Sequence, residues 1–336
     1  MINRKGILFF IVILFASNFY LSAKKLADLP RLTKFFHITV GDKCIYISDG
    51  KAYTVRVYSR KDYKYIKSFG RHGEGPGEFV NFPSTIYIKG NELVMSNNRE
   101  MHFTLEGKLI RERTIPLRYA KPVLNNYVGI EFENKRKLTR FGHPHMLINT
   151  YTNKFEKIKT IYKIIMKNVI MKRINEFECF SCRQDYDVVD DKIIISDPTK
   201  GFYFKVFDST GTKFYEINIP YKKIKVTNDI KNKELKAIKK EFGKHWKSLK
   251  QSNKFIWPDY IPAYMQVRVF NDKICAFTFN TKGDNIELII IDLKGKILGK
   301  TFVPRASQYM CTFKDGIYYY INEGEEVWEL HSLKVF

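Results

Sequence analysis

The chain has 336 residues, of which 44% are hydrophobic and 15% aromatic. This content of core-forming side chains excludes an intrinsically disordered chain and predicts a globular protein. Lys and Arg number 58 against 35 Asp and Glu, and the formal net charge of +23 excludes an acidic solvating tail.

The first residues have the layout of a signal peptide. Arg4 and Lys5 precede an apolar run over residues 7–15, and Leu21-Ser22-Ala23 follows with two small residues. The run is shorter than the roughly 20 apolar residues that a membrane-spanning helix needs. We therefore expect residues 1–23 to direct export to the periplasm or the extracellular space, with cleavage near Ala23. An uncleaved membrane anchor is the alternative.

A turn followed by a short apolar strand that ends in Ser-Asp recurs along the rest of the chain. Residues 41–49 and 190–197 are the clearest copies. Weaker copies lie at residues 90–97, 271–277 and 314–320. Most copies lead into two further strands, which we predict at residues 55–58 and 65–69, 102–105 and 109–115, 202–207 and 214–219, and 286–291 and 297–303.

A period of roughly 40 to 50 residues with about four short strands is typical of a β-propeller blade. Counting the copies predicts six blades, one of them degraded, around residues 127–162. The last blade ends at Phe336 without a fourth strand, and we expect residues 32–37 to supply it. This closure would remove the free sheet edges. The predicted fold is all-β, a six-bladed β-propeller of four-stranded antiparallel blades formed by residues 24–336 as one domain, closed by an N-terminal strand and carrying one inserted α-helix.

Two stretches exceed the blade pattern and are predicted insertions, residues 163–185 and residues 221–260. The second contains a predicted helix over about residues 228–250, capped by Thr227 or Asn228. Its apolar face is formed by Leu235, Ile238, Phe242, Trp246 and Leu249. We expect this helix to lie on the propeller with a solvated lysine face. The alternative is a surface that contacts an anionic membrane or polyanion through Lys236, Lys239 and Lys240.

Five cysteines are too few and too scattered to stabilise a chain of this size, so stability must come from the core. Cys179 and Cys182 have the spacing of a zinc hairpin or a redox pair, but no second pair of ligands accompanies them. Inert thiols, a local disulfide, and metal or redox chemistry remain alternatives for these two residues. We expect no metal site and no cofactor.

The segment between the first two blades reads Gly70-Arg-His-Gly-Glu-Gly-Pro-Gly-Glu-Phe79. Its glycines allow a compact path between blades, and we expect Phe79 to pack beneath it. The absence of a Gly-Lys-Ser or Gly-Lys-Thr sequence argues against a phosphate-binding loop. Arg71, His72 and Glu74 are the polar members of this loop. They are candidate ligand-binding residues, with ordinary loop surface as the alternative.

This segment, together with Asn81-Phe-Pro83, resembles the TolB-like six-bladed propellers related to NHL repeats. The resemblance covers the chain after the signal segment and includes the late helical insertion followed by Trp257-Pro258. It implies a six-bladed propeller exported from a bacterial cell. The chain departs from the family pattern at Asn97, in the third blade and after Phe277, which puts in doubt any site in blades three and five.

The sequence contains no recognisable catalytic motif. His143 and His145 flank a proline and cannot share a helix face, so with Glu131 and Glu133 nearby they are interpreted as loop surface. The predicted function is a non-enzymatic exported module that binds a protein, peptide or glycan at one end of the central channel. The alternatives are a propeller lyase or lactonase, and a membrane- or polyanion-associated protein that acts through the basic helix. No nucleic-acid partner is expected, because no module that reads nucleic acid is present.

Overall fold

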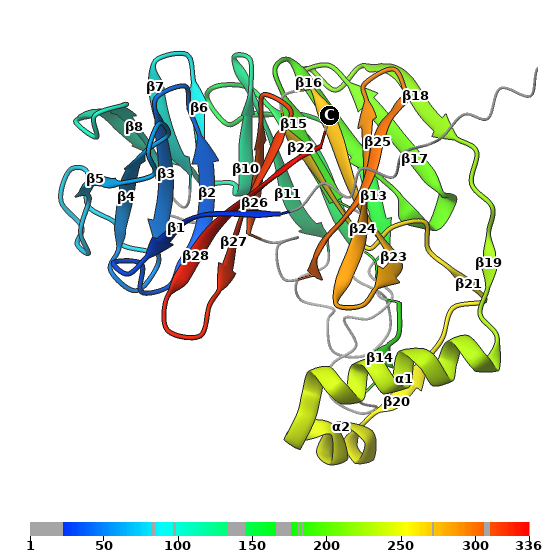
Figure 1. Ribbon diagram of the computed structural model, residues 1–336. Helices are drawn as coiled ribbons and strands as arrows, with labels where there is room; N and C mark the ends of the chain where they lie inside the picture. Colours follow the sequence, from blue (N-terminus) through cyan, green and yellow to red (C-terminus); the bar gives the residue numbers. More distant parts are fainter. Residues whose placement is uncertain are drawn as a thin grey trace, which may run out of the picture.

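Six four-stranded antiparallel sheets form the blades of a propeller (Figure 1). The computed structural model describes residues 23–335 except 82–84, 97–98, 134–144, 166–175, 181, 183–184, 271 and 306–309. The predicted six-bladed fold is confirmed, including a complete third blade where the repeat was barely recognisable. The predicted signal segment lies outside the described residues, apart from Ala23.

The first five blades follow the chain in order, and the first strand of each is innermost. Blade one contains β2 (Phe35–Val40), β3 (Cys44–Asp49), β4 (Thr54–Ser59) and β5 (Tyr65–Phe69). Blade two contains β6 (Ile86–Lys89), β7 (Glu92–Ser96), β8 (Arg99–Thr104) and β9 (Leu109–Thr114). Blade three contains β10 (Arg118–Val123), β11 (Asn126–Glu133), β12 (His145–Tyr151) and β13 (Lys157–Ile165).

The next two blades have the same order. Blade four contains β15 (Asp185–Val189), β16 (Lys192–Ser196), β17 (Phe202–Phe207) and β18 (Lys213–Ile219). Blade five contains β22 (Gln266–Phe270), β23 (Lys273–Lys282), β24 (Asn285–Asp292) and β25 (Ile297–Pro304). First strands of neighbouring blades contact one another, as β10 does with β15 and β15 with β22, so they surround the central channel.

An N-terminal strand closes the ring, as predicted, but a different segment supplies it. Blade six contains β26 (Cys311–Lys314), β27 (Ile317–Glu323) and β28 (Trp328–Lys334), and its outermost strand is β1 (Lys24–Leu29). The prediction that residues 32–37 form this strand is wrong, because Phe35 and His37 belong to β2. Pro30 follows β1 at once, and the more apolar segment after it fits an inner strand, where Phe35, Ile38 and Val40 are buried.

Apolar clusters between neighbouring blades form most of the core. One such cluster joins blades four and five around Phe204, Tyr264 and Ile289, and another joins blades five and six around Phe277 and Tyr318. The interface of blades two and three is different. Among the described residues, its apolar cluster has only four buried members, Ile115, Ala120, Tyr127 and Tyr151. Charged and polar side chains occupy the rest of the interface between blades two and three.

The two insertions meet in one small subdomain that projects from the propeller (Figure 1). In it β14 (Glu176–Glu178) pairs in parallel with β20 (Lys254–Ile256), and β19 (Ile224–Lys225) pairs with β21 (Tyr260–Ile261). The predicted single helix is two helices, α1 (Asn228–Phe242) and α2 (Trp246–Ser252), joined by a short 3-10 turn. The break occurs at Gly243, whose φ of +47° suits glycine. Thr227 caps α1, since its Oγ1 accepts a bond from Ile230 N at 3.4 Å.

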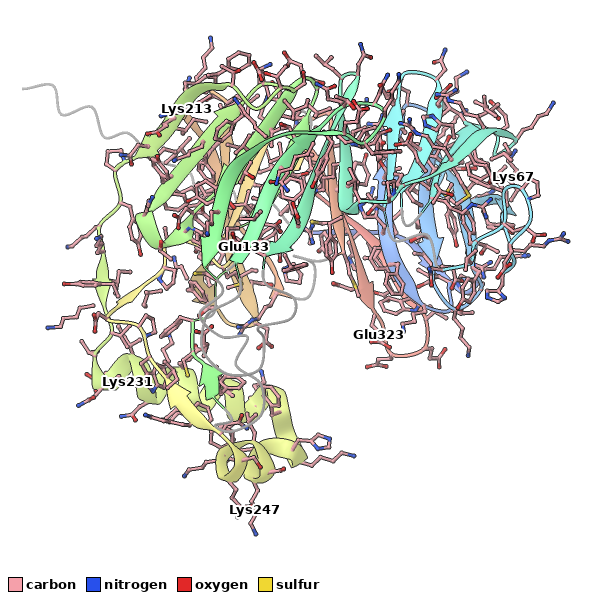
Figure 2. The ribbon with its side chains drawn as sticks, turned by 180° about the vertical axis from the view of Figure 1, so that it is seen from behind. Lys67, Glu133, Lys213, Lys231, Lys247 and Glu323 are labelled. Carbon is pink, nitrogen blue, oxygen red and sulfur yellow. The ribbon has the colours of Figure 1, made fainter. Side chains whose placement is uncertain are left out.

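The apolar face of the helical segment packs inside this subdomain, and the same cluster reaches Phe279 on β23 of blade five. Ile238 is buried with Cys179 and Phe180, and Trp246 and Leu249 pack against the same cluster. Most lysines of α1 are exposed, and Figure 2 shows Lys231 and Lys247 on the subdomain. Among the helices of the described residues, none is long and apolar enough to cross a membrane.

Candidate functional site

The glycine-rich loop folds over Phe79, as predicted. Phe79 is 1% exposed, and a Cβ on Gly70 would lie 2.1 Å from its ring. Gly70 also has a φ of +82°, which favours glycine. Both the contact with Phe79 and the backbone conformation therefore require glycine at this position. Glu78 closes the loop by accepting bonds from Gly75 N at 2.9 Å and from Arg71 Nε at 2.5 Å.

The three candidate residues of this loop do not converge on one point. Arg71 pairs with Glu78, and the ring of His72 lies edge-on to Tyr53 with 4.5 Å between centroids. Glu74 is exposed, and its backbone carbonyl accepts a bond from Arg99 at 3.3 Å. The loop therefore makes mainly structural contacts in the described part of the chain, and the ligand-binding role of these residues stays a prediction.

The lysines of α1 form an exposed basic surface. Lys236, Lys239 and Lys240 are all exposed, and Lys240 reaches Asp284 at the tip of the β23–β24 hairpin at 2.8 Å. Residues 221–260 contain 12 Lys and four acidic residues. Because the apolar face of α1 is covered, a partner would contact positive charges on this surface and not an apolar patch.

Charged side chains from the innermost strands meet within the central channel. Lys121 on β10 donates to Asp187 on β15 at 2.8 Å, which joins blades three and four. The other carboxylate oxygen of Asp187 accepts from Val269 N on β22 at 2.9 Å, which adds blade five. Arg268 lies next to Val269 on β22, and among the described residues it has no acidic partner. In the described part of the chain, this group thus has two cations, Lys121 and Arg268, for the one carboxylate of Asp187.

His37 on β2 of blade one is close enough to Lys121, Arg268 and Asp187 for their charges to act on its imidazole. Burial, together with the charges of Arg268 and Lys121, lowers the pKa of His37 to about 4, while the charge of Asp187 opposes this shift. Its Nδ1 is buried and has no hydrogen-bond partner among the described residues. Burial favours the neutral form of Asp187, but Lys121 and two backbone N–H groups hold its pKa below the usual value. At neutral pH the group is therefore a neutral histidine beside an excess of positive charge.

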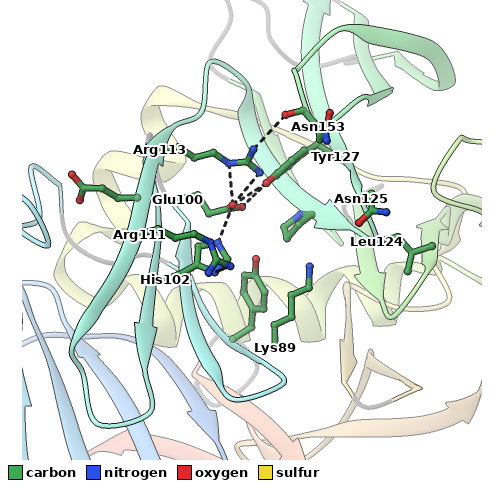
Figure 3. A pocket seen from close by; sticks show the side chains of 12 residues that line it. Lys89, Glu100, His102, Arg111, Arg113, Leu124, Asn125, Tyr127 and Asn153 are labelled. Atoms are coloured by element: carbon green, nitrogen blue, oxygen red, sulfur yellow. Dashed lines mark hydrogen bonds and ion pairs between the residues drawn. The ribbon is translucent and has the colours of Figure 1, made fainter.

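A separate pocket of about 330 Å³ opens between blades two and three, where the apolar cluster is small (Figure 3). Blade two contributes Tyr87 and Lys89 from β6, Glu100 and His102 from β8, and Arg111 and Arg113 from β9. Blade three contributes Pro122, Leu124, Asn125 and Tyr127. Glu112, which also lines the pocket, accepts a bond from Gly77 N of the glycine-rich loop at 3.1 Å.

The carboxylate of Glu100 is the centre of the polar network in this pocket (Figure 3). Glu100 is only 3% exposed. It accepts bonds from Tyr127 Oη at 2.8 and 2.9 Å, from Arg113 Nε at 3.2 Å, and contacts His102 Nε2 at 3.1 Å. Burial favours the neutral acid, but His102 and Arg113 hold the pKa of Glu100 below its usual value. The Tyr127 bond crosses the interface and fixes one blade to the other.

The imidazole of His102 joins Glu100 to a second ion pair. His102 Nδ1 lies 2.6 Å from Glu92, and Arg111 makes a bidentate contact with Glu92 at 2.7 and 2.8 Å. The bonds from Arg111 and His102 lower the pKa of Glu92 to about 2. Arg113 also lies over the Tyr127 ring, 4.9 Å from its centroid, and over Phe155. These contacts hold the guanidinium groups in fixed positions at the pocket wall.

The sequence did not predict this pocket. Its residues come from five strands and two turns of two blades, and no motif joins them. One signal was present, since Leu109-Ile-Arg-Glu-Arg-Thr114 places three charged residues in succession within a predicted strand.

The residues considered for a metal or for redox chemistry are separate. Glu131 accepts from Asn149 and Lys157, Glu133 pairs with Lys163, and His143 lies outside the described residues. No cluster of three or more metal-ligating side chains occurs within the described ranges. Cys179 and Cys182 are free thiols, and burial raises their pKa values to about 12 and about 11. These thiols are therefore poor nucleophiles at neutral pH.

No family model matches the chain, and no curated protein matches it. Among solved structures, the chain is similar to a Bacteroides fragilis protein described as exported, with 12% identity, a TM-score of 0.52, and coverage of 93% of this chain and 94% of that chain. BamB from Moraxella catarrhalis is matched at 8% identity and a TM-score of 0.36, with coverage of 89% and 84%. At 12% identity the first likeness shows the fold alone, which is that of a six-bladed β-propeller.

Proposed function

We propose that the chain is an exported, non-enzymatic binding module that holds a protein, peptide or glycan at one end of its central channel, through an acidic group that reaches into the channel. The observation that carries this proposal is the charge imbalance there. Lys121 is neutralised by Asp187, whereas Arg268 has no acidic partner among the described residues. A buried or half-buried cation without a counter-charge is costly, so a ligand carboxylate or sulfate would gain from filling this place.

The supporting geometry is the convergence of side chains from several blades in the channel. Lys121, Asp187 and Arg268 lie midway along three neighbouring inner strands, and His37 faces them from β2. When the side-chain amide of Gln266 is turned so that its oxygen faces Arg268, this oxygen accepts bonds from Nε and Nη2 at 2.8 Å, which would orient the guanidinium. A guanidinium held in this way presents its remaining N–H groups as a fork suited to a carboxylate.

Export and family membership belong to the same proposal. The layout of Arg4, Lys5 and the apolar run supports a signal peptide, and the similar Bacteroides fragilis protein is described as exported. The segment from Gly70 to Phe79 supports membership in the TolB-like propellers related to NHL repeats.

The experiment is a titration with an acidic peptide that contains Glu residues and a free C-terminal carboxylate, compared with its amidated Gln counterpart. We expect the acidic peptide alone to bind, and Arg268→Gln to weaken its affinity by about tenfold or more, because a charge-assisted bond is lost. Arg305→Gln is the matched control, since Arg305 is exposed at the end of the same blade. Equal affinity of the two peptides, or no effect of Arg268→Gln, would contradict the proposal.

The enzymatic alternative has its own assay. Turnover of a lactone or of a uronate-containing polysaccharide by the wild-type chain, lost in the Arg268→Gln variant, would show a lyase or lactonase and contradict a purely binding role.

The basic surface supports a second candidate function, contact with an anionic membrane or cell-surface polymer. Lys236, Lys239 and Lys240 are exposed on a helix whose apolar face is buried within the subdomain. The contact would therefore be electrostatic and sensitive to salt, without insertion of apolar side chains.

A further inference from the structure

The interface between blades two and three is built differently from its neighbours. Counting described residues, the apolar cluster between blades one and two has nine buried members and the cluster between blades three and four has eight. Between blades two and three the described residues provide four, and a pocket with a charged wall occupies the rest. A structural interface gains most from dry apolar packing, so this departure requires a reason beyond stability.

The pocket has the size and the lining of a small-molecule site. Its volume of about 330 Å³ falls at the lower end of the roughly 300–1,000 Å³ typical of ligand pockets. Fixed donors (Arg111, Arg113) and a fixed acceptor (Glu100) lie close together in its wall, and the side chain of Asn125 adds both kinds of group. Hydroxyl groups donate and accept at once, so a polyhydroxylated ligand matches this alternation.

Apolar surface accompanies the polar groups. The rings of Tyr87 and Tyr127, Pro122 and the half-exposed Leu124 line the same pocket. A pyranose ring presents a C–H face beside its hydroxyl groups, and this face packs on aromatic and aliphatic side chains. The hydroxyl of Tyr87 is buried without a hydrogen-bond partner among the described residues, which leaves one polar group of the pocket unsatisfied.

The charges of the pocket residues indicate that the ligand carries an acidic group. Three carboxylates, Glu92, Glu100 and Glu112, are matched by Arg111, Arg113 and Arg99. Lys89 at the rim is exposed and has no acidic partner among the described residues. In Figure 3 its side chain extends beside the pocket, opposite the Glu100 network.

From these observations we infer that the pocket between blades two and three is a second binding site, which takes an acidic sugar of one or two units. The Glu100 network and Asn125 bind its hydroxyl groups, the apolar wall packs on its ring, and Lys89 pairs with its carboxylate or sulfate. This site is separate from the channel, so its ligand binds whether or not the channel is occupied.

Glucuronic acid is the probe, and glucose and inorganic phosphate are the comparison ligands. Calorimetry or ligand-observed NMR on the full chain measures their binding affinities. We expect glucuronic acid to bind more tightly than glucose or phosphate. Lys89→Gln and Asn125→Ala should each weaken it about tenfold, because each removes a direct polar contact at an exposed position. Lys108→Gln is the matched control, since Lys108 is exposed at another turn of blade two and lies outside the pocket.

Four results would overturn the inference. In the first two, glucuronic acid fails to bind, or both pocket substitutions leave its affinity unchanged. Alternatively, phosphate competes with glucuronic acid at equal affinity, which would show a simple anion site. Glucose binding as tightly as glucuronic acid would contradict the acidic class of ligand. Arg268→Gln should leave glucuronic acid binding unchanged, so failure of this inference and failure of the channel proposal are distinguishable.

Discussion

Asp49 shows why Ser-Asp ends the second strand of a blade. Its carboxylate is fully buried and accepts bonds from Thr33 N at 2.9 Å and Oγ1 at 2.6 Å, Lys34 N at 3.1 Å, Ala52 N at 3.3 Å and Arg56 Nε at 2.8 Å. Burial favours the neutral acid, but these donors hold the pKa of Asp49 below its usual value. One side chain thus fixes the entry to the innermost strand and the turn between the middle strands.

Asp49→Ala should therefore lower the free energy of unfolding by about 3–5 kcal/mol, because it removes a fully buried carboxylate and leaves the largely covered guanidinium of Arg56 without its counter-charge. Urea denaturation measures the effect. Asp42→Ala is the control, since Asp42 is 85% exposed and pairs with Lys314 on the surface, so its loss should have little effect on stability. Equal effects of the two substitutions would refute the role of Asp49.

The buried neutral imidazole of His37 predicts a specific dependence of stability on pH. Its folded pKa of about 4 lies below the ordinary value of 6.5, so the unfolded chain binds the proton more tightly. The stability contribution is complete above pH 6.5 and is lost as the pH falls toward 4, by on the order of 1–3 kcal/mol.

His37→Gln should therefore make the unfolding free energy fall less steeply over this pH range than in the wild type. Chemical denaturation at several pH values measures both slopes. Parallel slopes would show that His37 does not stay neutral in the folded chain.

Among the secondary-structure elements, α1 has the surface for which the sequence suggests a partner most directly. Its lysine face is exposed and its apolar face is covered, so we expect binding to heparin or to anionic vesicles to depend on charge alone. Reversing Lys236, Lys239 and Lys240 to Glu should abolish salt-sensitive binding. The exposed pair of Lys240 with Asp284 should cost little when it is lost.

The matched control for α1 reverses Lys43, Lys51 and Lys61, which are exposed on blade one and give the same change in net charge. Co-sedimentation with vesicles or heparin chromatography compares the two variants. Equal loss in both would show a response to net charge, and unchanged binding in the α1 variant would remove the proposed surface.

The elements of the blades and the helical insertion could be predicted from the sequence, whereas the joining of the two insertions into one subdomain could not. Strands such as residues 44–49 carry a local pattern of turn, apolar run and polar end. By contrast, β14 and β20 are three-residue strands far apart in the chain, and only their shared core around Phe177 and Phe255 brings them together. The break in the helix depended on Gly243, which an apolar periodicity alone does not reveal.

Ring closure by β1 is the prediction at the scale of the whole molecule. Leu29 is fully buried and pairs with Trp328, and β1 covers an otherwise free edge of β28. A chain without residues 1–29 should therefore unfold more easily than one without residues 1–22, by more than about 3 kcal/mol, and should associate through the free edge. Equal unfolding midpoints and a monomeric truncated chain would contradict this closure.

The contacts between separate blades are the parts of the candidate sites that could not be predicted from the sequence. The repeat predicts how many blades there are, but not which side chains of separate blades face one another across an interface. Lys121 and Asp187, or Glu100 and Tyr127, become neighbours only when the ring closes. Their charges sit at strand positions that the blade pattern leaves free, so no local signal marks them as partners.

The most direct test of the central claim is the pKa of His37, measured by NMR with and without the bound acidic peptide. In the free chain burial and two cations hold this pKa at about 4. A ligand carboxylate in the channel would neutralise Arg268 and stabilise the imidazolium, so the account predicts a clear rise in the pKa on binding. Binding of the peptide with an unchanged His37 pKa would contradict a ligand in the channel.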